Sequence, residues 1–287
     1  MLPPLQNNVP LSRLSTFGIG GPAAYYAEAK TIKEMQALLC YAKEHSLPFF
    51  VLGKGSNSLF DDKGFNGLVI ANKIAFMECK DNTVFVGAGY SFSLLGTQLA
   101  KMGLSGLEFA SGIPATVGGA IYMNAGANGQ QTAHALKEVT FVHSDTKIQT
   151  FTKEELFFSY RTSSFQSMKG AIVSATFTLE KQDSARNRQL EIIAYRKKTQ
   201  PYNDLSCGCI FRNPPGDSAG ALIERCGLIG HSYGGASVSP VHANFIVNKG
   251  FATAADVLAL AQHIKTEVNT RTGIELEMEV RFVPFIS

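Results

Sequence analysis

Residues 49–58 read FFVLGKGSNS, and this stretch decides the fold class of the chain. Its four apolar residues have the length and composition of a buried β-strand. The glycines at 53 and 55 let consecutive backbone amides approach a phosphate without hindrance from a Cβ atom. A tight turn between two elements is the alternative interpretation. Ser58 stands where the dinucleotide-binding fingerprint needs glycine, and the P-loop pattern is absent, so neither common nucleotide motif is matched.

On either side of this stretch, helical and strand patterns alternate, which predicts an α+β or α/β fold. The expected elements are helices over residues 31–45, 94–102 and 184–199, strands over 49–52, 68–71 and 84–86, and a hairpin of 139–142 with 148–151. Thr31 is the expected N-cap of the first helix. Residues 172–179 alternate too loosely to fix which face of a strand is buried.

Turn-forming residues at 200–204 indicate a domain junction near residue 200. Beyond it, Thr253 and Asp256 form the capping box of a predicted helix. A strand is expected over residues 274–282. One of its faces would carry Ile274, Leu276, Met278, Val280 and Phe282, and the other Glu275, Glu277, Glu279 and Arg281.

The composition is that of a globular protein with many turns, since 45% of the 287 residues are hydrophobic and 27 are glycine. A chain of this length predicts at least two domains. Its net charge of +3 is too small to indicate nucleic-acid binding. No run approaches the roughly 18 apolar residues of a membrane helix. Residues 1–10 lack the pattern of a secretory leader, so we expect a cytoplasmic protein without membrane insertion.

The five cysteines are irregularly spaced, which argues against a disulfide framework. A zinc site is conceivable from Cys207, Cys209, Cys226, His231 and His242. Because zinc sites space paired cysteines by two residues or more, we expect no metal.

A second glycine-rich stretch covers residues 103–129, where neither helical nor strand periodicity is evident. A loop of that length inside a compact domain is usually functional. Residues 111–120, SGIPATVGGA, offer glycines and hydroxyls against which a flat ring could lie, and residues 124–127 extend that surface. Close packing of two elements is the alternative interpretation.

Arg161 follows Tyr160 and precedes a run of hydroxyl-bearing residues, a setting in which a guanidinium can be held for a carboxylate. An ordinary surface arginine is the alternative. Glu279 belongs to a row with Glu275 and Glu277 whose default explanation is the solvated face of a strand, and spacing alone does not choose among them.

The motifs form an ordered series that spans nearly the whole chain. The series consists of residues 16–23 (TFGIGGPA), 53–58, 108–114 (EFASGIP), 118–126, Tyr160-Arg161, 207–214 (CGCIFRNP), Gly220 with Leu222-Ile223, 242–245 (HANF) and 279–281 (EVR). Each motif is weak alone, but the series resembles the UDP-N-acetylenolpyruvoylglucosamine reductase (MurB) family of peptidoglycan synthesis.

The resemblance implies an α+β fold, with a two-lobed FAD-binding domain of the vanillyl-alcohol oxidase/PCMH type and a smaller α+β C-terminal substrate-binding domain. The FAD-binding region would cover residues 1–199, in lobes of about 1–72 and 73–199. The C-terminal domain would cover 200–287, with the last strand a candidate to return to the first lobe. The short span from Arg161 to Cys209 indicates the form of the family that lacks a tyrosine-bearing loop insertion.

The resemblance also implies an FAD-dependent oxidoreductase, UDP-N-acetylmuramate dehydrogenase, with NADPH as co-substrate. It would reduce UDP-N-acetylglucosamine enolpyruvate to UDP-N-acetylmuramate, a step that serves cell wall biogenesis, cell shape and cell division. Tyr160 and Asn213 would contact this small-molecule substrate, and no nucleic acid or obligate protein partner is expected. The implied FAD contacts are Gly53, Lys54, Gly55, Ser56, Asn57, Ser58, Ser111, Gly112, Pro114, Thr116, Gly118, Gly119, Asn124 and Gly126.

Catalytic roles carry over to Arg161 and Glu279, which would stabilise an enol-like intermediate. Cys209 would protonate that intermediate in place of the serine usual in the family. Thr199 stands where many members have lysine, so the contacts to the substrate diphosphate stay open.

Two rival functions remain. Another flavin oxidoreductase of the same fold, oxidising an alcohol with oxygen, would share the glycine-rich loops but would not need Arg161, Cys209 and Glu279 together. A catalytically silent nucleotide-sugar-binding module would purify without colour.

Overall fold

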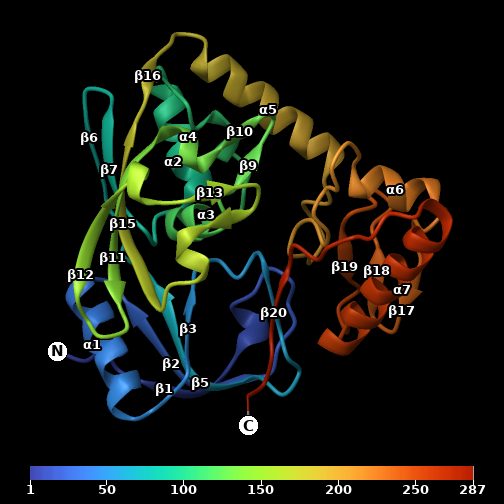
Figure 1. Cartoon of the computed structure of the whole chain (residues 1–287), viewed down its shortest axis with the longest axis horizontal. Helices are drawn as coiled ribbons and strands as arrows, with labels where there is room; N and C mark the ends of the chain where they lie inside the picture. The colour runs from blue at the N-terminus through green and yellow to red at the C-terminus, as the bar shows by residue number, and fades with distance from the viewer. Residues whose placement is uncertain (287) are drawn as a thin grey trace. The chain divides into compact units, whose positions relative to one another are not determined.

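The computed structural model describes residues 1–286, which form two compact units (Figure 1). The first unit consists of Met1–Gln6, Tyr25–Lys54 and Gly67–Arg196. The second consists of Asn7–Ala24, Gly55–Asn66 and the described residues from Lys197 onward. Each unit therefore combines separate stretches of the chain, and the expected division into residues 1–199 and 200–287 stays a prediction.

A five-stranded antiparallel sheet organises the first unit, in the order β12-β11-β15-β7-β6. The strands are β6 (Met77–Lys80), β7 (Thr83–Gly87), β11 (Leu136–His143), β12 (Ile148–Thr152) and β15 (Gly170–Thr178). The helices α1 (Ile32–Glu44), α2 (Phe92–Lys101) and α3 (Val117–Tyr122) contribute to its cores. Side chains of α2 and α3 pack against β15 in one cluster, and those of α1 pack against it in another. Because β15 is buried on both faces, residues 172–179 show no clean alternation.

A second sheet has the strand order β1 (Gln6–Pro10), β2 (Pro22–Ala29), β5 (Phe65–Asn72) and β3 (Phe49–Leu52). The expected strand at 49–52 is confirmed and pairs in parallel with β5, although only Leu52 of its four residues is buried. The helix predicted after Thr31 is also confirmed. Thr31 Oγ1 accepts the Glu34 N–H at 3.2 Å, and Glu34 Oε2 accepts the Thr31 N–H at 3.1 Å.

The other predicted elements of residues 84–199 are confirmed as well, including the antiparallel hairpin of β11 with β12. The shorter elements are β8 (Leu104–Ser105), β9 (Gly126–Ala127), β10 (Gln130–Gln131), α4 (Thr132–Ala135), β13 (Phe158–Ser159), β14 (Thr162–Ser163) and β16 (Glu180–Lys181), and α5 (Ala185–Thr199) follows them. Short 3-10 helices cover Leu11–Arg13, Glu108–Ala110, Lys153–Glu155 and Ser164–Gln166.

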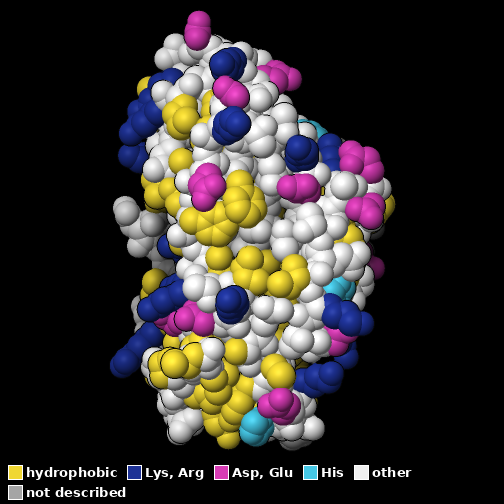
Figure 2. All heavy atoms as spheres, turned by 90° about the vertical axis from the view of Figure 1, so that its left-hand side faces the viewer, with side chains coloured by type: hydrophobic (Ala, Val, Ile, Leu, Met, Phe, Trp, Pro, Cys, Tyr) yellow, Lys and Arg dark blue, Asp and Glu magenta, His cyan; other side chains and the backbone are white. Residues whose placement is uncertain are grey.

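Apolar side chains gather on the side of the molecule shown in Figure 2. On the strands of the five-stranded sheet, Phe85 and Ile148 are 39% and 49% exposed. The rings of Phe76 and Phe85 contact one another, with centroids 5.0 Å apart.

The second unit contains the antiparallel sheet β17 (Ser232–Tyr233), β18 (Ala236–Val238) and β19 (Ile246–Asn248), with helices α6 (Ala219–Arg225) and α7 (Ala254–Thr272). The capping box predicted for α7 is confirmed, because Thr253 and Asp256 exchange hydrogen bonds of 3.1 and 3.0 Å. Asp62 Oδ1 also accepts the Ala254 N–H at 2.7 Å, which satisfies a further amide of the first turn. The last strand, β20 (Arg281–Val283), pairs in parallel with β4 (Ser58–Phe60).

The prediction of one continuous strand over residues 274–282 is wrong, since only Arg281–Val283 is a strand. The preceding residues are hydrogen-bonded to a different segment. The Glu279 N–H donates to Ile210 O at 2.8 Å, whereas the Arg281 N–H donates to Asn57 O at 3.1 Å. This change of partner breaks the alternation, and Phe282 is 38% exposed instead of buried.

The glycine-rich stretch at 103–129 is more ordered than its sequence predicts. Thr116 caps α3, whose six residues include Gly118 and Gly119. Glycine is a poor helix former, which is why the helix left no clear periodicity. Among the described residues, no helix has both the length and the apolar character that crossing a membrane requires.

Candidate active site

The loop after β3 needs glycine at two positions. A Cβ atom on Gly53 would lie 2.6 Å from Thr116 Oγ1. Gly55 has a φ of +64°, and a Cβ atom there would lie 2.5 Å from Leu14 O. Both distances are too short for a side chain, so the loop conformation depends on these glycines. Other predicted cofactor residues that are half-buried or exposed are Lys54, Ser56, Asn57, Ser58 and Pro114.

Thr116 lies among glycines in the first unit. Its Oγ1 accepts the Gly119 N–H at 3.3 Å, and it is the atom that a Cβ on Gly53 would meet. Gly118 approaches the end of β7 so closely that a Cβ atom would lie 3.0 Å from Ala88 Cβ. The structure therefore brings Gly53, Thr116 and Gly119 together in a surface with few side chains. Such a surface fits the flat ring or phosphates of a flavin nucleotide.

The loop at residues 111–112 is held by hydrogen bonds from the helices α2 and α5. Ser111 is fully buried, and its hydroxyl lies 3.3 Å from Thr97 Oγ1. The Gly112 N–H donates to Ser93 Oγ at 2.7 Å, and Arg196 donates to Gly112 O at 3.3 Å. Because the Ser111 side chain faces the interior, its contribution to a cofactor site would come from the backbone.

Asn124 is 1% exposed, and its side chain is engaged inside the first unit. Its Nδ2 donates to Gln131 Oε1 and Ser159 O, both at 2.9 Å, and its Oδ1 accepts the Ala133 N–H at 3.1 Å. Both amide hydrogens are thus used to hold neighbouring segments. Gly126 pairs with Gln131 between β9 and β10.

Arg161 lies in the two-residue turn between β13 and β14 and is half-buried. Its φ of +55° is in the left-handed region, which costs an ordinary residue about 1 kcal/mol. Gln166 Nε2 donates to both Arg161 O and Tyr122 O at 3.0 Å, which holds this conformation. The guanidinium carbon lies 5.0 Å from the centre of the Tyr160 ring, within cation–π range. Sequence reasoning missed Gln166, because its partners are main-chain atoms.

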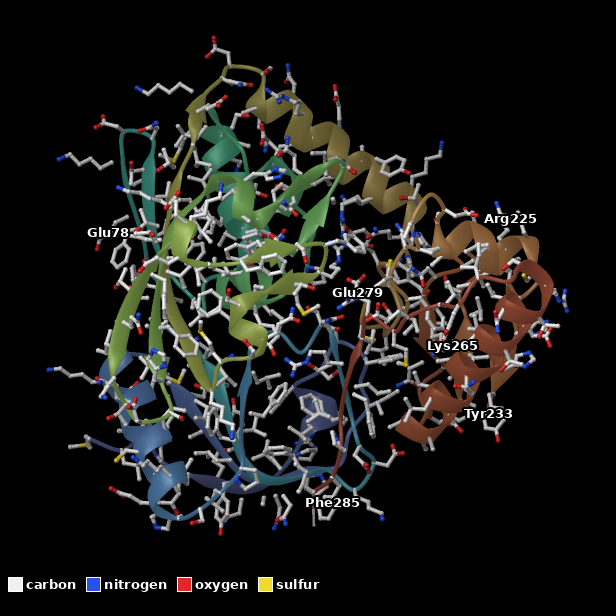
Figure 3. All side chains as sticks on the ribbon, in the orientation of Figure 1. Glu78, Arg225, Tyr233, Lys265, Glu279 and Phe285 are labelled. Atoms are coloured by element: carbon white, nitrogen blue, oxygen red, sulfur yellow. The ribbon has the colours of Figure 1, made fainter. Side chains whose placement is uncertain are left out.

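Cys209 and Glu279 lie close together in the second unit. The Glu279 N–H donates to the carbonyl of Ile210, the residue after Cys209, at 2.8 Å. Both side chains are half-buried, and Glu279 is labelled on the extended C-terminal segment in Figure 3. Asn57 Nδ2 donates to Glu279 O at 3.3 Å, so this segment is bonded on two sides.

The neighbouring thiol of Cys207 differs from that of Cys209 because it is buried. Burial raises the pKa of Cys207, and the charges of Cys209 and Glu279 raise that pKa further. Cys207 is therefore a weaker acid than an ordinary thiol and is buried, which makes it a poor candidate for proton donation.

Asn213 is exposed, and its Oδ1 accepts the Ala219 N–H at 3.0 Å at the start of α6. Asn213, a predicted substrate contact, therefore also satisfies a main-chain amide at the start of α6. Within residues 1–286, no group of three His, Cys, Asp or Glu side chains is arranged to hold a metal ion.

Two family profiles match the chain. One, described as UDP-N-acetylenolpyruvoylglucosamine reductase, C-terminal domain, matches residues 200–283. The other, described as FAD binding domain, matches residues 23–152, which include both glycine-rich stretches.

Similar proteins match over nearly the whole chain. The UDP-N-acetylenolpyruvoylglucosamine reductase of Protochlamydia amoebophila is 58% identical over 98% of this chain and 94% of its own length. That of Chlamydia trachomatis serovar D is 48% identical over 98% of this chain and 97% of its own length. The crystal structure of UDP-N-acetylenolpyruvylglucosamine reductase (MurB) from Thermus caldophilus has a TM-score of 0.85 at 37% identity, covering 99% of this chain and 100% of that one. These matches confirm the α+β fold class, with an FAD-binding domain and a separate C-terminal domain.

Proposed function

The chain belongs to the UDP-N-acetylenolpyruvoylglucosamine reductase family, and on that premise we propose that it reduces UDP-N-acetylglucosamine enolpyruvate to UDP-N-acetylmuramate with NADPH and bound FAD. The observation that carries the proposal is the hydrogen bond that joins the segment of Cys209 to the segment of Glu279. A thiol and a carboxylate lie on hydrogen-bonded segments of the second unit, at the positions where the family motifs place the proton donor and the enol-stabilising group.

The residues that would hold FAD are Gly53, Thr116 and Gly119, together with the backbone of residues 111–112. They fit the cofactor because two of them lack side chains and the Thr116 side chain is buried beside them, where its hydroxyl caps α3. When bound, FAD would accept a hydride from NADPH and supply it to the vinyl carbon of the enolpyruvyl group.

The protein's own part of the reaction is to stabilise charge and to deliver a proton. Hydride addition shifts an electron pair onto the substrate carboxylate, where the Arg161 guanidinium offsets the developing negative charge. The Glu279 carboxylate accepts a hydrogen bond from the enol form. The Cys209 S–H bond then breaks as a C–H bond forms at the second enol carbon, and the resulting thiolate regains a proton from solvent.

Tyr160 and Asn213 would contact the UDP-sugar, and the proposal requires no nucleic acid or protein partner. Both side chains are exposed and so are accessible to a ligand. A cytoplasmic location accords with a reaction that consumes NADPH and a nucleotide sugar.

The proposal is tested by steady-state turnover of the purified protein. Oxidation of NADPH beyond the one equivalent that reduces the flavin should require the enolpyruvyl UDP-sugar, and the product should carry one added hydride and one added proton. NADPH oxidation that needs oxygen but not the sugar nucleotide would instead indicate an alcohol-oxidising flavoenzyme. A colourless preparation that binds the sugar nucleotide without turnover would indicate a binding module.

A further inference from the structure

We propose that Asn244 is a positioning residue, which holds the main chain that carries Cys209 and pairs with Glu279. The inference rests on the proposed function, because it concerns the alignment of the proton donor with the enol-stabilising carboxylate. Neither the motif comparison nor the reaction chemistry assigns a role to Asn244.

Asn244 is 3% exposed, and its side chain binds both the main-chain N–H and the main-chain O of Phe211. Its Oδ1 accepts the Phe211 N–H at 3.0 Å, and its Nδ2 donates to Phe211 O at 2.8 Å. Its main-chain O accepts the Ile210 N–H at 2.8 Å. Three hydrogen bonds therefore fix two consecutive residues, and the first of these follows Cys209 directly.

The segment that contains these two residues also pairs with the segment of Glu279. Ile210 O accepts the Glu279 N–H at 2.8 Å, and Phe211 forms an antiparallel bridge with Met278. Cys209 itself forms an antiparallel bridge with Phe245, the neighbour of Asn244. Residues 209–211 thus lie between two segments, one carrying Asn244 and the other Glu279. A displacement of this central segment moves Cys209 and alters its register with Glu279 at the same time.

Losing one of these hydrogen bonds costs free energy because the groups are buried. Removing one partner leaves the other without its hydrogen bond, and the main chain then shifts to regain one. A shift of about 1 Å in a reacting group can slow a reaction by about 10²-fold. Such a shift would slow proton delivery and weaken enol stabilisation, and both belong to the half-reaction with the sugar nucleotide.

Asn248 is a matched control in the same unit. It is 8% exposed, its Nδ2 donates to Phe17 O at 3.0 Å, and its Oδ1 accepts the Gly250 N–H at 2.8 Å. Asn248 is thus also a buried asparagine that bonds main-chain groups on both sides of its amide. Its partners lie outside residues 209–211, so a purely structural cost should appear at both asparagines alike.

The test compares Asn244→Asp with Asn248→Asp in the flavin-loaded, full-length protein. Each change keeps the side-chain volume but replaces the amide donor by a carboxylate oxygen. We expect Asn244→Asp to leave flavin reduction by NADPH unchanged and to slow anaerobic flavin reoxidation by the enolpyruvyl UDP-sugar by about 10²-fold. Alkylation of Cys209 by iodoacetamide, followed by mass spectrometry without substrate, should be faster than in the parent. Asn248→Asp should keep the parent values in all three measurements.

Equal reoxidation rates in the two variants, or equal loss in both half-reactions of Asn244→Asp, would overturn the positioning role. If Asn244→Asp does not fold, the comparison is made between Asn244→Ser and Asn248→Ser with the same criteria. If the parent protein itself is not reoxidised by the sugar nucleotide, the proposed function fails, and that result is distinct from a variant-specific one.

Discussion

Replacing Cys209 by alanine should remove the proton donor without disturbing the fold. The neighbouring main-chain hydrogen bonds, from Ile210 N–H to Asn244 O and from Glu279 N–H to Ile210 O, do not involve the Cys209 side chain. Because that side chain is only half-buried, truncation should cost about 1 kcal/mol of stability or less. Loss of a general acid typically slows a reaction by about 10²- to 10⁴-fold, or about 3–5 kcal/mol of barrier.

The assay separates the half-reactions in a stopped-flow instrument. Cys209→Ala should be reduced by NADPH at the parent rate and reoxidised by the enolpyruvyl UDP-sugar at about 10⁻² to 10⁻⁴ of the parent rate. Cys209→Ser should retain appreciable turnover, since a hydroxyl can also donate a proton, and it should resist inactivation by thiol alkylation. Cys207→Ala is the control and should change the rates of flavin reduction and reoxidation only slightly. Reoxidation of Cys209→Ala at the parent rate would refute the reasoning and leave Cys209 with a packing role.

Three further predictions follow from other contacts. Glu279→Gln should keep flavin reduction near normal and slow reoxidation by orders of magnitude, whereas the exposed Glu277→Gln should behave as the parent in the same stopped-flow traces. Gly55→Val should abolish flavin retention, because a side chain there meets Leu14 O, whereas Gly216→Val, with φ +78° and no atom within 4 Å of its Cβ position, should retain flavin on gel filtration. Burial lowers the pKa of His242, so the unfolded state binds its proton more readily. Stability in urea titrations should therefore fall as the pH drops from about 6.5 through the lower folded pKa, and His242→Gln should flatten that dependence.

The elements predicted well from the sequence are those with a cap and an amphipathic period. Thr31 and Thr253 each begin a helix with a capping box, and both helices were predicted from those residues. The strand at 274–282 was predicted too long, because its regular alternation continues while its hydrogen-bonding partner changes near Glu279. Partner identity is a long-range property that a local pattern does not contain.

The catalytic and binding roles of the candidate residues stay predictions. Residue types alone left Arg161 and Glu279 no better supported than surface charges, and only the ordered series of motifs singled them out. The sequence did not indicate the roles of Gln166 and Asn244. Each side chain binds main-chain atoms of a residue elsewhere in the sequence, and main-chain partners leave no pattern in the residue types. For Asn124, the sequence indicated a cofactor contact, but its side chain is bonded within the protein.

The most direct test of the account is a single anaerobic turnover. The yellow protein is first bleached with one equivalent of NADPH, and the enolpyruvyl UDP-sugar is then added without oxygen. The account predicts that the flavin absorbance returns and that UDP-N-acetylmuramate forms in an amount equal to the flavin reoxidised. Flavin that stays reduced until oxygen is admitted would contradict it.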